Sequence, residues 1–343
     1  MHTLAALING IVGSGRTSLP AIASHLPDGK QRESRIKRFE RFLKNERLCQ
    51  ETFFMPFASA LLARLPAGPL VLVMDASEVG RGCLALVHAS MNVVVSLVFH
   101  KRALPLAWIV VKGNKGHLAD QTHRHLLEKL SPLIGPHRTV IFLGDGEFDG
   151  CGLLAAVRER GWRFVCRTAK NVQLEEAGFE GCSFSFADLC VCLGPGQCIE
   201  VPDTFFTMQG WGPVLALAVW EKGYKEPLFL VSNLELAQEA LFWYKKRFLI
   251  ETLFSDQKSR GFFLHKSHFS DPSRLARLLI ATCLAYLWLV LLGAQVMGNP
   301  VWRGKVHRCH RCDLSLFSLG RAWLQECLNE GWRVPVAFSL SKL

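Results

Sequence analysis

Four side chains between Tyr244 and Lys258 are of types that could act together in chemistry: an aromatic ring, a carboxylate and two cations. On one α-helix, at about 100° per residue, Tyr244, Arg247, Glu251 and Lys258 would lie at about 0°, 300°, 340° and 320°. They would form one narrow stripe. The opposite side would carry apolar residues that we expect to face the core: Phe242, Leu249, Ile250 and Leu253.

Two upstream aspartates add carboxylates to this stripe. Asp75 ends the apolar run that begins at Leu70, and Asp145 ends the run that begins at Val140. Each run predicts a buried strand with the acid at its tip. A charged helix stripe is often only a solvated face, and one such aspartate is often a turn or helix cap. Burying a carboxylate is costly, so the two aspartates with the helical Glu predict a site at the end of a sheet.

Three carboxylates from separate elements provide hard oxygen ligands. Such a set suits Mg²⁺, which keeps several waters and completes its shell with substrate phosphate. Two ions about 3.5 to 4 Å apart can activate the attacking oxygen and stabilise the leaving oxygen of a phosphodiester. The candidate ligands Asp75, Asp145 and Glu251 therefore indicate nuclease or polynucleotidyl-transfer chemistry.

The spacing of the stripe is Tyr, two residues, Arg, three residues, Glu, six residues, Lys. With this spacing the chain resembles the bacterial insertion-sequence transposases of the DDE class that carry a Tyr-Arg-Glu-Lys signature. The resemblance extends to Met74–Ser77, to Leu143–Phe148 and to Pro227–Asn233 ahead of the signature. It covers most of the chain, from about Arg35 to Gly320.

The resemblance implies an α/β fold with a ribonuclease-H-like catalytic core and a mainly β insertion between the second Asp and the Glu. It implies that Asp75, Asp145 and Glu251 bind two divalent ions, Mg²⁺ or Mn²⁺. In such transposases the site cuts a strand at each transposon end, and the freed 3′-hydroxyl then attacks target DNA. The expected partners are therefore inverted-repeat ends and target DNA, with a homodimer bringing two ends together.

The same resemblance implies that Tyr244, Arg247 and Lys258 hold the phosphates and an unstacked base of the DNA end. Cations on the carboxylate's own face would pair with phosphates presented there. Near the second aspartate, Glu147 and Asp149 compete for the ligand role, but only Asp145 directly follows the strand.

In relatives that pass through a DNA hairpin, a Trp in the strand before the signature wedges against the DNA. The matching stretch here, Glu226–Asn233, has no Trp. The hairpin step therefore stays open, with Trp211 and Trp220 as alternatives.

Composition fits a protein that works on DNA. The formal net charge is +11 and the pI about 9.2, and Lys and Arg bind a polyanion by releasing its counterions. The twelve cysteines are scattered and no signal region is evident, so we expect the cytoplasm of a bacterium, at the nucleoid.

Two segments allow a second interpretation. His307, Cys309, His310 and Cys312 could bind Zn²⁺, although a basic, solvent-facing segment is favoured because no second ligand pair is evident. The apolar run 277–293 approaches the length of a membrane span. We expect it instead to be a helix buried behind the catalytic sheet, with no membrane involved.

These anchors predict the organisation of the chain. Residues 1–65 form a helical DNA-binding region, in which the basic segment 34–44 places Ile36, Phe39 and Leu43 on an apolar stripe. The catalytic core occupies 66–169 and 227–343, the latter with C-terminal helices, and the β insertion occupies 170–226. Within the core we expect strands at 70–75, 92–99, 106–112, 140–144, 163–167 and from 228, and helices near 119–130 and 150–160.

Charged turns could also contact the DNA backbone, or simply be solvated. Lys101 and Arg102 form one such turn, and Lys112 to Gly116 forms the other.

Three functions remain. The first is an active transposase. The second is a metal-dependent nuclease of the same fold that cuts without joining, and the third is a catalytically inactive DNA-binding descendant. The intact set of three acids favours catalysis over the last.

Overall fold

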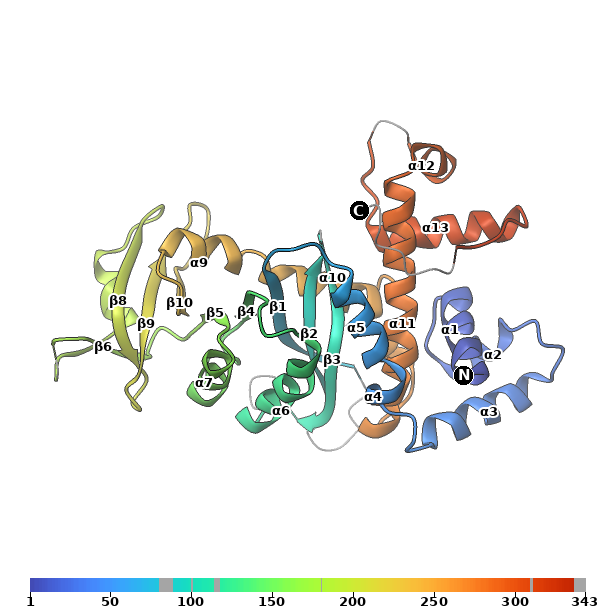
Figure 1. The fold of residues 1–343 in the computed structure, drawn as a ribbon, viewed down its shortest axis with the longest axis horizontal. Helices are drawn as coiled ribbons and strands as arrows, with labels where there is room; N and C mark the ends of the chain where they lie inside the picture. Colours follow the sequence, from blue (N-terminus) through green and yellow to red (C-terminus); the bar gives the residue numbers. More distant parts are fainter. Residues whose placement is uncertain (80–88, 100, 114–117, 180, 309–310, 336–343) are drawn as a thin grey trace.

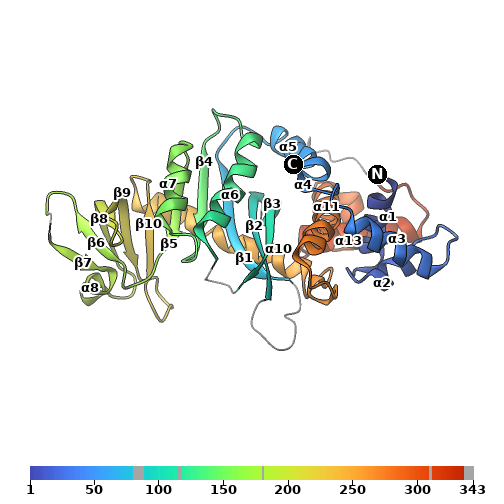
Figure 2. The same ribbon diagram turned by 90° about the horizontal axis from the view of Figure 1, so that it is seen from below.

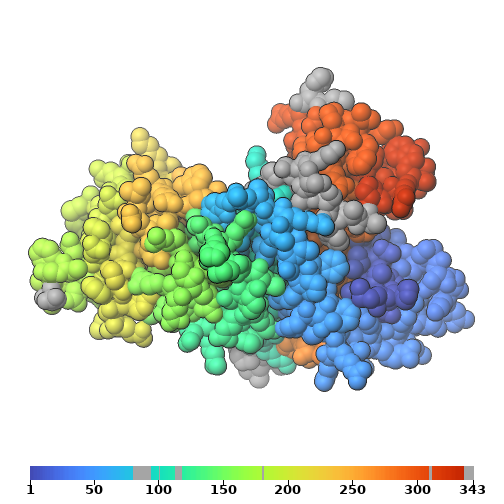
Figure 3. Space-filling model, in the orientation of Figure 1, coloured from blue at the N-terminus to red at the C-terminus, as the bar shows by residue number. Residues whose placement is uncertain are grey.

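The computed structural model describes residues 1–79, 89–99, 101–113, 118–179, 181–308 and 311–335. These residues form a mixed α/β protein built on one sheet with the strand order β3-β2-β1-β4-β5-β10-β9-β8-β6-β7. The molecule is elongated, with helices gathered beyond β3 and the β8–β9 strands towards the opposite end (Figure 1). The space-filling view shows the N-terminal and C-terminal helices together at one end (Figure 3).

The half of the sheet nearest the helical end contains one antiparallel hairpin and three parallel strands. β1 pairs antiparallel with β2, which pairs antiparallel with β3, whereas β1, β4 and β5 run parallel to one another. Their bounds are β1 (Leu70–Glu78), β2 (Ala89–Phe99), β3 (Arg102–Gly113), β4 (Val140–Gly144) and β5 (Arg163–Arg167). The strands expected from the apolar runs are thereby confirmed.

Helices cover both faces of this half-sheet, which explains why its parallel strands are built around apolar runs. Every residue of β4 is buried. Helices α6 (Asp120–Leu130) and α7 (Cys151–Glu159) lie on one face, and α9 (Ala237–Tyr244) and α10 (Ile250–Gln257) lie on the other (Figures 1 and 2). The helices expected near 119–130 and 150–160 are confirmed as α6 and α7.

The segment between β5 and β10 is rich in short strands, and it extends the same sheet. β10 pairs antiparallel with β5 on one side and with β9 on the other, and β8 and β6 follow outward. The bounds are β6 (Gln173–Glu176), β7 (Ser183–Ser185), α8 (Phe186–Leu189), η2 (Cys190–Cys192), β8 (Cys198–Phe206), β9 (Trp211–Val219) and β10 (Leu228–Ser232).

The N-terminal region is helical, with α1 (His2–Ser14), α2 (Leu19–Ser24), α3 (Arg32–Lys44), α4 (Gln50–Phe53) and α5 (Met55–Ala63). On α3, Phe39 and Leu43 are fully buried as the stripe predicts. Arg35 is also buried, which the stripe does not predict. Its guanidinium donates to the carbonyl oxygen of Ala23 at 2.8 Å and pairs with Asp28, whereas Lys37, Arg41 and Lys44 stay exposed.

The long apolar helix α11 (Pro272–Met297) is a core helix of the described structure. By length and composition alone it could cross a membrane, but 83% of its most apolar window is buried inside the protein. It lies beside the edge strand β3 and packs against α1 and α13. The expected burial is confirmed, but the expected place behind the sheet is wrong, because α11 lies at the sheet's edge with helices on its other sides. The remaining helical segments are η1 (Ser131–Leu133), η3 (Arg247–Leu249), η4 (Leu264–Lys266), α12 (Pro300–Val306) and α13 (Leu316–Asn329).

Two glycines let α11 and α13 touch backbone to backbone. A Cβ on Gly293 would lie 1.8 Å from the carbonyl oxygen of Leu316, and a Cβ on Gly320 would lie 1.9 Å from that of Leu289. Real Cβ atoms do not approach so closely, so any larger residue at either position would force the helices apart. This contact fixes α13 across the C-terminal third of α11.

Candidate active site

The parallel pairing of β1 with β4 sets the first two acids at the same height. The register pairs Leu70 with Val140 and continues to Val73 with Leu143. Continuing it by two residues places Asp75 opposite Asp145, at the carboxyl ends of neighbouring parallel strands. This is the edge at which open α/β sheets bind their ligands.

Asp75 lies inside its strand, and the expectation of a strand-tip acid is wrong in this respect. β1 continues to Glu78 because β2 pairs with it beyond the last β4 contact, with Asp75 opposite Val94. The side chain is only 4% exposed, and its Oδ1 accepts a hydrogen bond from the Ala76 amide at 2.7 Å. Backbone pairing therefore holds this carboxylate firmly.

Asp145 does follow its strand directly, and it begins a turn. Its Oδ1 accepts from the Glu147 amide at 3.1 Å, and its carbonyl oxygen accepts from the Phe148 amide at 2.9 Å. The competitor Asp149 is engaged elsewhere, because the Thr168 hydroxyl donates to its Oδ2 at 2.6 Å. Burial raises the pKa of Asp149, and the nearby charge of Asp145 adds to that rise.

The signature segment is not one continuous helix. It consists of α9, which ends at Tyr244, the 3₁₀ turn η3 over Arg247–Leu249, and α10, which ends at Gln257. The single regular α-helix is therefore wrong, since the helix tightens to a 3₁₀ turn after Tyr244, although Lys245 and Lys246 keep right-handed helical backbone angles, and Lys258 lies just beyond the end of α10.

The predicted division into a core face and a working face is also partly wrong. Ile250 and Leu253 are fully buried as expected, but Phe242 is 56% exposed. Tyr244 and Arg247, assigned to the working face, are only 2% and 7% exposed. Arg247 packs towards the sheet, where it meets Asp75 of β1.

Arg247 links the signature to the first acid. Its Nη1 lies 3.6 Å from Oδ2 of Asp75, and its guanidinium lies over the rings of Phe248, at 4.4 Å, and Tyr244, at 5.8 Å. Burial raises the pKa of Tyr244, and the charges of Arg247 and Arg167 oppose that rise. The structure thus brings together Asp75, Arg247 and Tyr244.

Glu251 stands one turn further along, on the exposed side of α10. Helix α10 packs on β1 and β3, so this carboxylate projects from an element next to the Asp75 strand. Among the described residues, no group of three or more His, Cys, Asp or Glu side chains is close enough together to hold a metal ion. The structure therefore aligns two of the three predicted ligands and does not complete the set.

Sequence reasoning missed a buried acid at the end of the same helix. Arg102 donates from Nη1 to Oδ2 of Asp256 at 2.7 Å, and both side chains are largely buried. Burial raises the pKa of Asp256 to about 6, against the opposing charges of Arg102, Arg260 and Arg321. The expectation that Arg102 is solvated or contacts DNA is wrong, since this contact ties the β2–β3 hairpin to α10. The signal available in the sequence was an acid three residues after Leu253, on the apolar side of the segment.

Two further residues near Asp145 were also missed. The β4–β5 register pairs Gly144 with Cys166, so Arg167 lies level with Asp145. His123 on α6 is buried against the Phe148 ring at 4.8 Å, and its Nε2 has no hydrogen-bond partner within the described structure. Burial lowers the pKa of His123, opposed by the charges of Asp120 and Asp145. The position of Arg167 directly after a predicted parallel strand could have revealed it.

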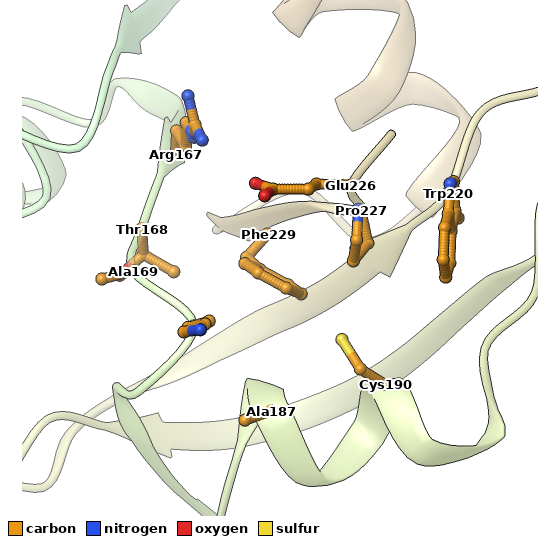
Figure 4. A pocket seen from close by; sticks show the side chains of 10 residues that line it. Arg167, Thr168, Ala169, Ala187, Cys190, Trp220, Glu226, Pro227 and Phe229 are labelled. Carbon is orange, nitrogen blue, oxygen red and sulfur yellow. The ribbon is translucent and has the colours of Figure 1, made fainter. Parts of the chain in front are cut away.

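A pocket of about 450 Å³ opens next to Arg167. Figure 4 shows the Trp220 indole and Pro227 on one side and Arg167 and Thr168 on the other, with Phe229 between them. The rest of the lining is Ala169, Lys170, Ala187, Cys190 and the carboxylate of Glu226. The pocket therefore combines an aromatic surface with two cations and one acid.

The two alternative tryptophans differ in their surroundings. Trp220 borders this pocket, whereas Trp211 is packed against the Arg158 guanidinium at 4.2 Å and the Phe206 ring at 5.7 Å. Trp211 is therefore engaged in holding α7 against the outer strands.

The predicted zinc cluster and the predicted charged turn from Lys112 to Gly116 lie partly outside the described residues. The described residues do not include Cys309, His310 or Lys115. His307 is described, and its Nε2 lies 2.6 Å from Oδ1 of Asp313.

Comparison with known families decides the class of the protein. The family model for the transposase DDE domain matches residues 68–288, which is more than half of the chain. The chain belongs to the DDE transposase domain family. The matched residues of this DDE transposase include Asp75, Asp145 and the whole signature segment. DDE transposases generally use divalent metal ions. None of the curated proteins matches the chain.

One solved structure agrees with the fold of a transposase. The chain is similar to the piggyBac transposase in a cryo-EM structure of its synaptic complex with hairpin DNA. The two are 10% identical, 98% of this chain and 72% of that chain are covered, and the TM-score is 0.51.

Two endonuclease V structures are also similar, the human catalytic domain and the Bacillus subtilis protein. Each is 12% identical, with 69% and 62% of this chain and 93% and 86% of theirs covered. Their TM-scores are both 0.29.

The burial of Asp256 predicts a pH dependence of stability. From pH 3.8 to about 6, the folded DDE transposase keeps a proton on Asp256 that the unfolded chain has released. Its free energy of unfolding should therefore fall as the pH rises through this window, by up to ~3 kcal/mol relative to Asp256→Asn. Urea unfolding of both proteins across the window measures this, and a constant difference between them would contradict burial as the cause.

Proposed function

We propose that this protein is an active DNA transposase that cuts transposon ends and transfers the 3′-hydroxyl strand to target DNA. The family match supports the class. The observation that carries the proposal is the register of β1 and β4, which sets Asp75 and Asp145 side by side at the carboxyl edge of the sheet. The strand order β3-β2-β1-β4-β5, a hairpin beside parallel strands, supports a ribonuclease-H-like core.

The donor set suits Mg²⁺ or Mn²⁺, since it consists of carboxylate oxygens from three elements. A buried, ionised Asp75 needs a positive charge beside it, and the structure already places one there. Asp75, Asp145 and Glu251 would hold two ions, which would supply a Lewis acid on each side of the scissile phosphate.

The protein's own groups would position the DNA. Arg247 and Lys258 would hold phosphates of the transposon end, as the signature implies. Tyr244, which is only 2% exposed, would have to turn outward to meet an unstacked base. The exposed cations of α3, Lys37, Arg41 and Lys44, lie three or four residues apart on one helix face, a spacing that suits contacts along a phosphate backbone. These contacts would place the scissile bond at the carboxylates while α3 holds the flanking duplex.

The substrates would be the inverted-repeat ends and target DNA. The piggyBac structure that the chain is similar to is a synaptic complex with hairpin DNA, which supports DNA as the partner here. The protein would act in the bacterial cytoplasm at the nucleoid, without a membrane.

Cleavage and joining of labelled DNA that carries the gene's own flanking ends tests the proposal. With Mg²⁺ we expect nicking at the end boundary followed by joined product, and with EDTA neither. Glu251→Ala should lower the cutting rate by roughly 100-fold or more, because it removes a metal ligand. Glu235→Ala, which removes an equally exposed carboxylate ahead of α9, should cut normally.

The alternatives give different results in the same assay. Cutting that ignores the end sequence and yields no joined product would indicate the nuclease. Metal-independent binding with no cutting would indicate the inactive descendant.

The pocket beside Arg167 generates a second test. Its aromatic wall and its two cations, which outnumber the one acid Glu226, suit an unpaired nucleotide, because a base stacks on an indole while Arg and Lys neutralise its phosphate. With 2-aminopurine at the end's terminal positions, wild-type protein should change the probe's fluorescence and Trp220→Ala should not. Trp211→Phe, which keeps an aromatic ring in its packed site, serves as the control. Equal responses from wild type and Trp220→Ala would exclude the pocket.

Transposition requires two ends to be joined, so we expect two protein copies in the DNA complex. Light scattering of the protein with and without end DNA measures this. One protein copy for each pair of joined ends would refute the homodimer.

A further inference from the structure

Arg247 is a buried cation with incomplete partners. Its side chain is 7% exposed, and within the described structure its Nε has no hydrogen-bond partner. The guanidinium rests on the Phe248 ring at 4.4 Å. Removing a charge from water costs free energy, so a buried guanidinium must be balanced by an opposite charge nearby.

Asp75 supplies that charge through one oxygen. Its Oδ1 is occupied by the Ala76 amide at 2.7 Å, whereas its Oδ2 faces Nη1 of Arg247 at 3.6 Å. This separation makes an ion pair without a close hydrogen bond. Arg247 therefore neutralises the carboxylate, yet it is held more loosely than Arg102, whose Nη1 lies 2.7 Å from Asp256.

We propose that Arg247 is a removable counter-cation for Asp75. The Arg247 guanidinium occupies the place of a divalent ion, and it leaves when that ion and a DNA phosphate bind together. The proposal rests on the proposed function and deepens it. The oxygen that faces Arg247 is the one a metal ion would take, since the other accepts a backbone hydrogen bond. Two cations within about 4 Å of one oxygen would repel each other.

A phosphate provides the new partner that Arg247 needs in order to leave. A guanidinium binds two phosphate oxygens at once through parallel N–H donors, which a single distant carboxylate oxygen does not permit. Phosphate binding would thus release Asp75 to the metal, and metal binding would release Arg247 to the phosphate. By linkage, each ligand strengthens the binding of the other.

This role differs from that of a residue that only grips DNA. A gripping residue affects DNA affinity and leaves metal binding unchanged when DNA is absent. A counter-cation competes with the metal in the protein alone, so removing its charge must strengthen metal binding without DNA.

Calorimetric titration of Mn²⁺ into the full-length protein without DNA tests the proposal. Arg247→Gln should bind Mn²⁺ roughly 5-fold more tightly than wild type, or more. The matched control is Lys245→Gln, which removes the same charge two residues away, where the ammonium pairs with Glu221 on the surface. It should bind as wild type does. Circular dichroism checks that each variant is folded.

A second variant keeps the test decisive if Arg247→Gln does not fold. Arg247→Lys retains the charge but not the paired donors, so it should bind Mn²⁺ as wild type does without DNA. Adding end DNA should then strengthen metal binding less than in wild type. A Lys variant with the full DNA-induced strengthening would overturn the proposal.

Asp75→Asn separates this proposal from the proposed function. If Asp75→Asn weakens Mn²⁺ binding but Arg247→Gln binds no more tightly than wild type, the counter-cation role of Arg247 is refuted. The assignment of Asp75 as a metal ligand is then still supported. If Asp75→Asn leaves Mn²⁺ binding unchanged, both the ligand assignment and the counter-cation fail.

Discussion

The parallel pairing of β1 with β4 is the constraint on which the rest of the structure depends. It fixes Asp75 and Asp145 at one height on neighbouring strands, and it requires both faces of these strands to be covered, because parallel strands present apolar side chains on each face. Helices α6 and α7 cover one face, and α9 and α10 cover the other. Helix α10, which carries Glu251, is one of these covering helices. The packing that buries the sheet therefore also holds Glu251 beside the strand of Asp75.

Buried charge pairs attach the signature segment to the sheet at two points. Arg247, in η3, pairs with Asp75 of β1, and Asp256, near the end of α10, pairs with Arg102 of β3. Glu251 lies between these two attachments. A buried pair contributes little net stability when complete and costs several kcal/mol when broken, roughly 3–5 kcal/mol. The pairs therefore favour one orientation of α10 over others. A site whose acids come from separate elements needs such a fixed orientation.

Apolar runs made the strands predictable, because a strand covered on both faces needs apolar side chains whatever its neighbours are. The extension of β1 past Asp75 was not predictable, since it depends on pairing with β2 through residues that are not uniformly apolar. The break after Tyr244 was missed because no Gly or Pro marks it, and Lys245 and Lys246 are good helix formers. The burial of Arg247 and Asp256 follows from tertiary partners, Asp75 and Arg102, that lie more than 150 residues away. Spacing could identify the acids but not these contacts.

Helix α11 is as long and apolar as a membrane span, yet it is covered by elements from both ends of the chain. α1 is synthesised before α11, whereas α13, which crosses α11 at Gly293 and Gly320, is synthesised after it. Until synthesis reaches α13, one side of a strongly apolar helix stays open to water and to any lipid surface. Copies of the gene truncated before α13 would yield chains prone to aggregate or to be degraded. A late stop codon would thus remove the protein altogether, although every acid of the site is encoded upstream.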